Sequence, residues 1–473
     1  MFARAEEVLE FVKIQEIKQI DIKVIDLQGR WRRMIYSAAH LTERFFEEGT
    51  GISLSPYPGY RNVESGDMKV RPDVTTGFLD PFHSVPTLSF ICDILNNDGT
   101  RYERDPRHIL QKAEGFLAKS KLGGSALFSP ELEFYVFDNA NYGSSAGSAY
   151  WSVESHGVSW GESDEPLYRA TGMQKIGQAD IPLDRHTEVR EQMVARIEQA
   201  GIKVKYHHHE LGTPGQAEIE VYFDTPVRTA DAMMIMKYMI KNTAIEYGKI
   251  ITFMPKPLYG HAGNGIHYHQ YIAKGDKSLF FDKSGYGGLS NMALSYLAGI
   301  LHHTPALMGL GNASTNSYRR FSPNLAAPVK LFFSLSNRSS AVRIPGYAVN
   351  EREARIEYRI PDATANPYLI IAAQLMAGLD GIRGKMDPTA MGLGPFDVNV
   401  FSLPKEELEQ LQNIPTSFGH ALRALDEDRS FLTEAGVFCD ELLTAWIQLK
   451  HTMEIAAVHE RPHPFEYELY FDL

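Results

Sequence analysis

The sequence is poor in cysteine and lacks long apolar runs, and both features limit the classes of protein to consider. Only Cys92 and Cys439 occur among 473 residues, with no CxxC pair, which argues against a disulfide framework or a thiolate metal site and fits a reducing compartment. No uncharged apolar run of about 18 residues is present, so we expect no membrane span. The first residues form a short amphipathic pattern that lacks the basic start and apolar stretch of a signal peptide. We therefore expect a cytoplasmic protein.

Positive charge is also scarce. Lysine and arginine number 47 against 59 acidic residues, for a net charge of −12. A general nucleic-acid binder needs a basic face, so no nucleic-acid partner is expected, whereas a small anionic substrate needs only local arginines. No GxxxxGK[ST] and no convincing GxGxxG is present, so a bound nucleotide would not be held by a P-loop or a Rossmann turn.

The chain is long and apolar enough, at 44% apolar residues, for a large core and more than one domain. The first hundred residues alternate between turn-like pieces and strand-like pieces, such as residues 20–26 and 87–94. The pattern changes at Asp105-Pro106-Arg107, where an N-cap and a proline predict a helix that runs to about residue 120. We predict a domain boundary here, which gives domains 1–104 and 105–473.

The second domain mixes strands with long helices. The predicted strands are 126–137, 218–223, 266–272 and 354–360, and the predicted helices are 185–200, 229–247, 291–308 and 366–379. Strands and helices interleaved in one large segment indicate an α+β or α/β core. Residues 139–180 are rich in glycine and serine and weakly patterned, and we expect a long loop there.

Carboxylates on strands are the strongest chemical signal. In SPELEF, Glu131 and Glu133 are two residues apart, so on a strand both point to one face while Leu132 and Phe134 point to the other. An exposed strand face with solvated glutamates is the alternative. In HHHELGTPGQAE, turn residues fold Glu210 and Glu218 toward each other.

Two further strands carry the same pattern. His267 and His269 share one face of GIHYH, and Arg355, Glu357 and Arg359 share one face of ARIEYRI. Carboxylates with an occasional imidazole are the ligands that Mg²⁺ and Mn²⁺ prefer. Two such ions would neutralise a triphosphate, and nearby arginines would hold it in place. For these arginines, ion pairing with the excess acidic residues is the alternative.

Taken together and in this order, the motifs resemble type I glutamine synthetases over nearly the whole chain. The matching segments are SPELEF, HHHELGTPGQAE, FMPKPLYG, GNGIHYH, NSYRRF, NRSSAVRIP, EARIEYRIPDATANPYL and HPFEYELYFDL. The resemblance implies a small N-terminal β-grasp domain and a large α+β catalytic domain with a strand-lined funnel. It also implies a homo-oligomer, a dodecamer of two hexameric rings with active sites between adjacent subunits, in which the C-terminal segment is a strap between the rings.

The resemblance further implies a role for each motif residue. Glu131, Glu210 and Glu218 would bind one metal ion, and Glu133, His267 and Glu357 the second. The ions would be Mg²⁺ or Mn²⁺, with ATP as cosubstrate. Gly263, His267, Arg320 and Arg359 would contact glutamate, and His269, Arg338, Arg343, Arg352 and Arg355 would bind ATP and its phosphates, Arg338 being catalytic. The implied reaction is phosphorylation of the γ-carboxylate of glutamate, followed by attack of an amine.

The amine pocket departs from the family pattern. The positions that capture ammonium in the family align with Glu48, Gly51, Gly177 and Ala326, and Glu48 is the remaining candidate for a catalytic base. Loss of a carboxylate at Ala326 removes a base and a negative charge, and glycine at 177 is expected to open volume. Ala262 stands at an asparagine position near glutamate, and Phe401 at a regulatory tyrosine position.

We therefore expect an ATP-dependent ligase that joins glutamate to an amine bulkier than ammonia, such as an aromatic amine of the aniline type. Its partners would be small-molecule substrates. An ammonium-using glutamine synthetase is one alternative. A non-catalytic structural or regulatory relative is another, although such a protein would be expected to lose metal ligands that are present here.

Overall fold

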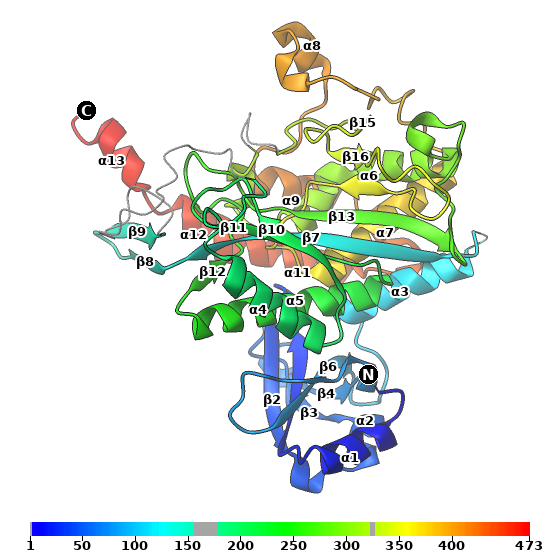
Figure 1. Ribbon diagram of the computed structural model, residues 1–473, viewed down its shortest axis with the longest axis vertical. Coiled ribbons are helices and arrows are strands. Elements are labelled where there is room, and N and C mark those ends of the chain that lie inside the picture. The colour runs from blue at the N-terminus through cyan, green and yellow to red at the C-terminus, as the bar shows by residue number, and fades with distance from the viewer. Residues whose placement is uncertain (1, 121, 156–176, 322–326) are drawn as a thin grey trace.

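A small and a large part, each built around its own sheet, make up the chain (Figure 1). The computed structural model describes residues 2–120, 122–155, 177–321 and 327–473. The small part contains a sheet of order β2-β1-β6-β4-β3, with β5 paired to β6. Its elements are α1 (Ala5–Ile14), β1 (Gln19–Ile25), β2 (Trp31–Ser37), α2 (Glu43–Glu48), β3 (Thr50–Ser53), β4 (Asp67–Pro72), β5 (Phe78–Leu79) and β6 (Thr87–Leu95).

The large part is built around a nine-stranded sheet of order β10-β11-β7-β13-β17-β16-β15, with β12 on β7 and β14 on β13. The strands are β7 (Ser125–Phe137), β10 (Val204–His209), β11 (Gln216–Val221), β12 (Ile250–Thr252), β13 (Ile266–Lys274), β14 (Lys277–Ser278), β15 (Phe333–Leu335), β16 (Val342–Ile344) and β17 (Ile356–Tyr358). The long helices are α3 (Pro106–Lys119), α4 (Thr187–Gln199), α5 (Pro226–Glu246), α6 (Asn291–Gly311) and α7 (Pro367–Gly384). The predicted α+β class is confirmed.

The predicted strands and helices of the large part are all present, with ends that differ by a few residues. Asp105 caps α3 as predicted, since its carboxylate accepts a hydrogen bond from the Arg107 backbone N–H at 3.0 Å. The C-terminal region adds α8 (Lys405–Gln410), α9 (Phe418–Glu427), α10 (Ser430–Thr433), α11 (Asp440–Lys450), α12 (Ala456–His459) and α13 (Pro464–Tyr470). Among the described residues, no helix combines the length and apolar character needed to cross a membrane.

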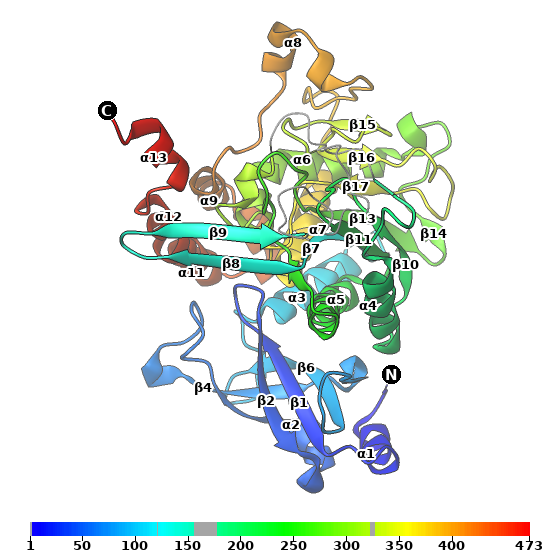
Figure 2. The ribbon, with the colours of Figure 1, turned by 60° about the vertical axis from the view of Figure 1, so that its left-hand side comes forward.

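The prediction of a loop after residue 139 is wrong for its first part. Residues there form a two-stranded hairpin of β8 (Asn139–Ser144) and β9 (Ala149–Glu154), which projects away from the main sheet (Figure 2). Tyr142 and Trp151 face each other across this hairpin and are 79% and 55% exposed. These cross-strand aromatics stabilise a ribbon without a core. Residues 156–176 of the predicted loop lie outside the described part.

One face of the large sheet packs on helices, and the opposite face carries predicted site residues. Tyr268 of β13 is buried and donates a hydrogen bond to the sulfur of Met233 on α5 at 3.4 Å, and Tyr358 of β17 contacts Thr304 of α6 at 3.2 Å. Since strand side chains alternate, the residues on either side of Tyr268 and Tyr358 point to the opposite face. This places the predicted His267, His269 and Glu357 together on that face.

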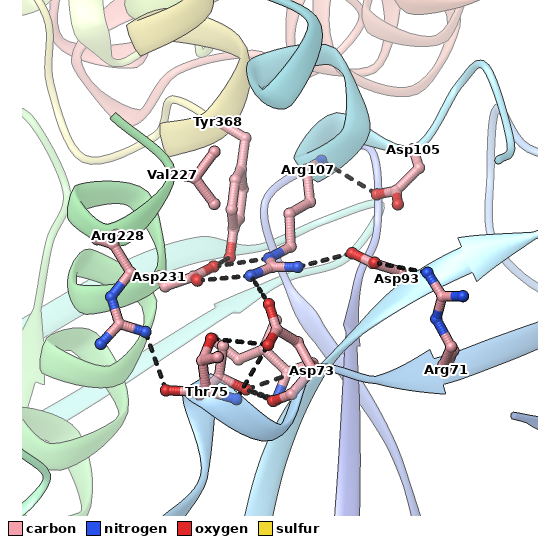
Figure 3. A network of polar contacts seen from close by, with 12 residues as sticks. Arg71, Asp73, Thr75, Asp93, Asp105, Arg107, Val227, Arg228, Asp231 and Tyr368 are labelled. Carbon is pink, nitrogen blue, oxygen red and sulfur yellow. Dashed lines mark hydrogen bonds and ion pairs between the residues drawn. The ribbon is translucent and has the colours of Figure 1, made fainter. Parts of the chain in front are cut away.

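A buried arginine joins the two parts (Figure 3). Arg107 of α3 contacts Asp231 of α5 through two nitrogens, at 3.1 and 3.0 Å, and also contacts Asp93 at 2.6 Å and Asp73 at 2.7 Å. Its side chain is 2% exposed. Asp93 lies on β6 and Asp73 follows β4 directly, so one guanidinium links the small sheet to two helices of the large part.

Candidate active site

Strand register gathers the acidic and histidine side chains. Glu131 of β7 lies opposite Glu220 of β11 on one side and His267 of β13 on the other. Two residues along, Glu133 pairs with Glu218, which pairs in turn with His208 of β10. Directly opposite residues on neighbouring strands share a face and lie within about 5.5 Å of each other. Four strands therefore supply one continuous acidic surface.

This surface forms the floor of a cavity of about 670 Å³. The cavity is lined by Glu131, Glu133, Gly177, Gln178, Tyr206, His208, Glu210, Leu211, Gln216, Glu218, Ala262, Gly263, His267, Arg320, Ala327, Arg338, Arg343, Tyr347 and Arg359. Eleven of the predicted site residues are among them. The structure thus brings together motifs that are more than 200 residues apart in the chain.

The first cluster consists of Glu131, His267 and Glu357, whose ligand atoms lie within 4.8 Å of one another. His267 Nδ1 is 2.8 Å from one Glu131 oxygen and 3.6 Å from Glu357. Burial, reinforced by the Arg359 guanidinium, lowers the pKa of His267 to about 4. The ring is therefore neutral near pH 7, the form that ligates metals.

The second cluster contains His208, Glu210 and Glu218, also within 4.8 Å of one another. Glu133 lies beside this cluster, directly opposite Glu218. Burial, and then the charges of Glu210 and Glu218, raise the pKa of Glu133 well above its usual value. Burial and carboxylate neighbours raise the pKa of Glu218 in the same way. Crowded, buried carboxylates that repel one another are what a hard divalent cation neutralises.

The grouping differs from the pairing that the resemblance implied. Glu131 belongs with His267 and Glu357, and Glu133 belongs with Glu210 and Glu218. The reason is the register: His267 is directly opposite Glu131, whereas Glu218 is directly opposite Glu133. With this exchange, the donors of both clusters fit a divalent ion. The first cluster offers two carboxylates and an imidazole, and the second offers three carboxylates with a neighbouring imidazole.

Four arginines, Arg320, Arg338, Arg343 and Arg359, also line the cavity. Arg343 Nε and Arg359 both contact the Glu357 carboxylate, while Arg338 is exposed. The Arg320 guanidinium is held by hydrogen bonds that it donates to the backbone carbonyls of Ile360 at 2.8 Å and Arg359 at 3.0 Å. Such anchoring presents a rigid guanidinium that is suited to a carboxylate or phosphate.

The GNG motif makes room for Arg320. A Cβ on Gly265 would overlap the Arg320 guanidinium, and one on Gly263 would lie 2.8 Å from its Cγ. The Gly265 N–H also donates to Glu133 at 2.5 Å. Asn264 is fully buried, with its side chain bonded to the Met254 carbonyl at 2.8 Å and to Gln216. Gly263 therefore lines the cavity beside Ala262, whereas Asn264 does not.

Some predicted residues are not brought to the cavity within one chain. His269 lies on the same sheet face but is fully buried, with its ring 2.8 Å from Glu131, and Arg355 is 3.4 Å from the same imidazole. Arg352 is exposed and 3.7 Å from Asp276. Glu48 and Gly51 lie in the small part on α2 and β3, where Glu48 pairs with Arg44 at 2.8 Å. Ala326 lies outside the described residues.

Sequence reasoning missed several lining residues. Tyr206 stacks on His208, with ring centroids 5.7 Å apart, and its hydroxyl is 3.3 Å from Glu131. Period-two alternation along residues 204–209 was the available signal, since residues 206 and 208 share the face of Glu218 and Glu220 across the hairpin. Leu211 and Gln216 lie within HHHELGTPGQAE but have no residue type that signals a site, and Gln178 and Tyr347 lie outside the matching segments.

Leu211 lies beside Gly177 and limits the volume that a glycine there is expected to open. A Cβ added to Gly177 would lie 3.0 Å from Cδ2 of Leu211, which also lines the cavity. That separation is tighter than ordinary van der Waals contact. The leucine therefore bounds the space beside residue 177 on one side.

Comparison with known families matches both parts of the chain. Residues 16–97 match the family described as "Glutamine synthetase, beta-Grasp domain", and residues 103–470 match "Glutamine synthetase, catalytic domain". The predicted β-grasp and catalytic architecture is thereby confirmed.

Several curated relatives are similar over their whole length. The glutamine synthetase of Mycolicibacterium smegmatis is 39% identical over 99% of both chains, and that of Microchaete diplosiphon is 41% identical over 99% of both. Among solved structures, the glutamine synthetase of Plasmodium falciparum superposes with a TM-score of 0.89 at 26% identity, covering 99% of both chains. A structure described as "Apo GmaS without ligand" gives a TM-score of 0.80 at 25% identity, covering 98% of this chain and 99% of that one.

Proposed function

The chain belongs to the glutamine synthetase family, and on that premise we propose that it is a ligase that joins ammonium to the γ-carboxylate of L-glutamate at the expense of ATP. In the first step the γ-phosphoryl group of ATP passes to a γ-carboxylate oxygen, which gives an acyl phosphate and ADP. In the second step ammonium gives up a proton, the resulting ammonia nitrogen attacks the carbonyl carbon, phosphate leaves and the nitrogen loses a second proton.

The observation that carries the proposal is the pairing of two carboxylate and histidine clusters with four arginines around one cavity. Phosphoryl transfer depends mainly on positioning and on neutralising charge. Glu131, His267 and Glu357 would hold one Mg²⁺ or Mn²⁺, and Glu133, Glu210 and Glu218 the other. Bound there, such ions supply charge neutralisation for the phosphates.

The protein groups divide between the two substrates. Arg338 and Arg343, which line the cavity with Tyr347, are proposed to hold the phosphates, with Arg338 stabilising the charge that develops on transfer. Arg320 and Arg359, with the Gly263 backbone, are proposed to hold the glutamate. Because Arg320 is already anchored to backbone carbonyls, it loses little freedom when the substrate binds. His269 and Arg355 support the floor, since each lies behind Glu131 or the ring that contacts it.

Ammonium is supported as the acceptor by the names of the relatives, which are glutamine synthetases at 39–41% identity, and by the position of Leu211, whose Cδ2 would lie 3.0 Å from a Cβ on Gly177. A bulkier amine is the second candidate. Its support is the segment of residues 322–326, Ser-Pro-Asn-Leu-Ala, which offers no carboxylate to attract a cation or to take its proton.

We also propose that the active site is completed between subunits. Glu48 and Gly51 do not line the cavity of their own chain, so a contribution to the amine pocket would come from an adjacent subunit of a homo-oligomer, a dodecamer by family resemblance. α13 and its C-cap carry Phe465, Tyr467 and Phe471, which are 53%, 54% and 74% exposed, as expected for a strap that packs on another subunit. A cytoplasmic location fits the scarcity of cysteine.

An acceptor screen tests the proposed function. Purified protein with glutamate, ATP and Mg²⁺ is given ammonium, methylamine, ethanolamine, a polyamine or aniline, with phosphate release and product mass as readouts. We expect glutamine and equal amounts of phosphate with ammonium. Higher turnover with a larger amine would favour the second candidate, and no turnover with any amine would overturn both. Glu131→Gln should abolish turnover, and Glu351→Gln, an exposed glutamate paired with Lys277, is the matched control.

A further inference from the structure

We propose that Leu211 determines which acceptors the enzyme accepts, by closing the amine subsite to anything larger than ammonium or a one-carbon amine. This rests on the proposed function. The starting observation is that Leu211 occupies the space beside Gly177, with Cδ2 3.0 Å and Cγ 3.7 Å from the position of a Cβ on that glycine. Both residues line the cavity.

Leu211 lies next to the reacting end of the site. It follows Glu210 directly, and its own N–H donates to the Glu210 carboxylate at 2.7 Å. Glu210 belongs to the second cluster. A group that touches the Leu211 side chain is therefore adjacent to the carboxylates proposed to bind the ion, where the activated γ-carboxyl must also be reached by the acceptor.

The backbone of the turn that carries Leu211 is braced. The Gly212 N–H donates to the Gln216 side chain at 2.8 Å, and Gln216 in turn donates to Asn264 at 3.0 Å. A Cβ on Gly212 would overlap the Tyr135 hydroxyl, so the backbone here is packed closely against β7. A braced turn holds Leu211 in one place when substrates bind.

The opposite wall is tied to the same turn. Gln178 adopts a left-handed backbone with φ of 60°, and its N–H donates to the His209 carbonyl at 2.7 Å. Non-glycine residues rarely adopt this conformation unless surrounding contacts impose it. Gly177 is thereby held against Leu211, and the gap between them cannot widen by movement of either segment alone.

The consequence is a small, partly apolar subsite. Ammonium or methylamine has little volume beyond the nitrogen, whereas an aniline ring would have to displace the leucine. Excluding or admitting one methylene in an apolar pocket changes discrimination by about 10–200-fold. Leu211→Ala removes three carbons, so it should relax the size limit by at least about tenfold.

The experiment compares kcat/KM for ammonium, methylamine, isopropylamine and aniline in the wild type, Leu211→Ala and Leu211→Val. We expect the ratio of larger amine to ammonium to rise by at least about tenfold in Leu211→Ala and by less in Leu211→Val. KM for glutamate and for ATP should stay unchanged, because neither substrate contacts this wall in the proposed arrangement. Leu294→Ala, a half-buried leucine of α6 that packs on the core, is the control for general loosening.

Gly177→Ala tests the contact from its other side. The added methyl group would press on Leu211, and we expect a lower kcat/KM for ammonium that the double variant Gly177→Ala/Leu211→Ala recovers. The single variant Gly177→Ala keeps the test decisive if Leu211→Ala does not fold, because an unchanged kcat/KM for ammonium in it would overturn the inference.

The outcomes separate the inference from the proposed function. An unchanged acceptor ratio in Leu211→Ala and Leu211→Val, in an enzyme that makes glutamine, would overturn the role of Leu211 and leave the proposed function intact. A wild type that already prefers isopropylamine or aniline would overturn the size limit. Absence of phosphate release with every acceptor would overturn the proposed function and the inference together.

Discussion

Glu131 and His267 are cross-strand partners on β7 and β13, and an oxygen of the carboxylate lies 2.8 Å from Nδ1 of the imidazole. Burial and the neighbouring Arg359 lower the pKa of His267 to about 4, so the ring is neutral near pH 7 and has a lone pair to offer. We predict that His267→Gln weakens Mn²⁺ binding by more than the roughly 10–100-fold loss that is typical for residues behind the ligands. The Mn²⁺ affinity is measured by titration with Mn²⁺, with electron paramagnetic resonance as the readout.

His40 is the matched control, because it is an exposed histidine of the small part. His40→Gln should bind Mn²⁺ as the wild type does. Equal Mn²⁺ affinity in His267→Gln and the wild type would contradict the assignment of His267 as a ligand.

The hydroxyl of Tyr206 lies 3.3 Å from the Glu131 oxygen that also contacts His269. A hydrogen bond to a ligating carboxylate fixes its orientation. Tyr206→Phe keeps the stacking on His208 and removes only that bond, so we predict about 10-fold weaker Mn²⁺ binding with little change in KM for glutamate. Parallel Mn²⁺ titration and steady-state kinetics check both parts.

Tyr222→Phe serves as the control, since Tyr222 is 55% exposed and follows the next strand. A rise in the KM for glutamate as large as the loss of Mn²⁺ affinity would indicate that Tyr206 acts on the whole cavity rather than on Glu131.

The acidic floor could be predicted because its physical signal is local. Strands such as β7 alternate polar and apolar residues, so the shared face of Glu131 and Glu133 follows from their spacing. Which carboxylate joins which cluster could not be predicted in this way. That depends on register between strands more than 80 residues apart, as for Glu131 with His267, and a slip of two residues would exchange the pairs.

The amine end of the site shows the limit of reasoning from an absent side chain. A glycine at 177 indicates lost volume, but whether the space stays open depends on what packs beside it, and Leu211 is 34 positions away in the chain. The hairpin of β8 and β9 was missed for a related reason. Its pairing is between exposed residues, so no buried face imposes the alternation that identifies a strand.

Arg107 is the next target, because it forms ion pairs with three carboxylates at the junction of the two parts. Removing one partner of a buried ion pair leaves the other charges uncompensated and costs about 3–5 kcal/mol. We predict that Arg107→Met lowers the free energy of unfolding by about this amount, which urea titration followed by circular dichroism measures. Lys277→Met is the control, since its ion pair with Glu351 is 62% and 54% exposed and such pairs contribute about 0–1 kcal/mol. Equal effects of the two substitutions would contradict a role for Arg107 in joining the parts.

His303 gives the fold a pH dependence that is separate from the cavity. Its Nδ1 lies 2.7 Å from Asp428 and its Nε2 3.1 Å from Asp380, and the ring stacks on Phe431. Burial opposes the charged form, but the hydrogen bonds and charges of Asp428 and Asp380 outweigh it and raise the pKa of His303. Only the protonated ring can donate to both carboxylates.

The raised pKa of His303 sets the pH range in which this residue stabilises the fold. A pKa raised in the folded state gives stability that is fully present below the unfolded value of about 6.5 and is lost as the pH rises through the folded pKa. We predict that His303→Gln destabilises the protein most at about pH 6 and progressively less toward about pH 9, as measured by urea unfolding at a series of pH values. Asp428→Asn should remove most of that pH dependence, because it removes the closer carboxylate. A difference between wild type and His303→Gln that stays constant with pH would show that His303 contributes through its stacking on Phe431 and not through its charge.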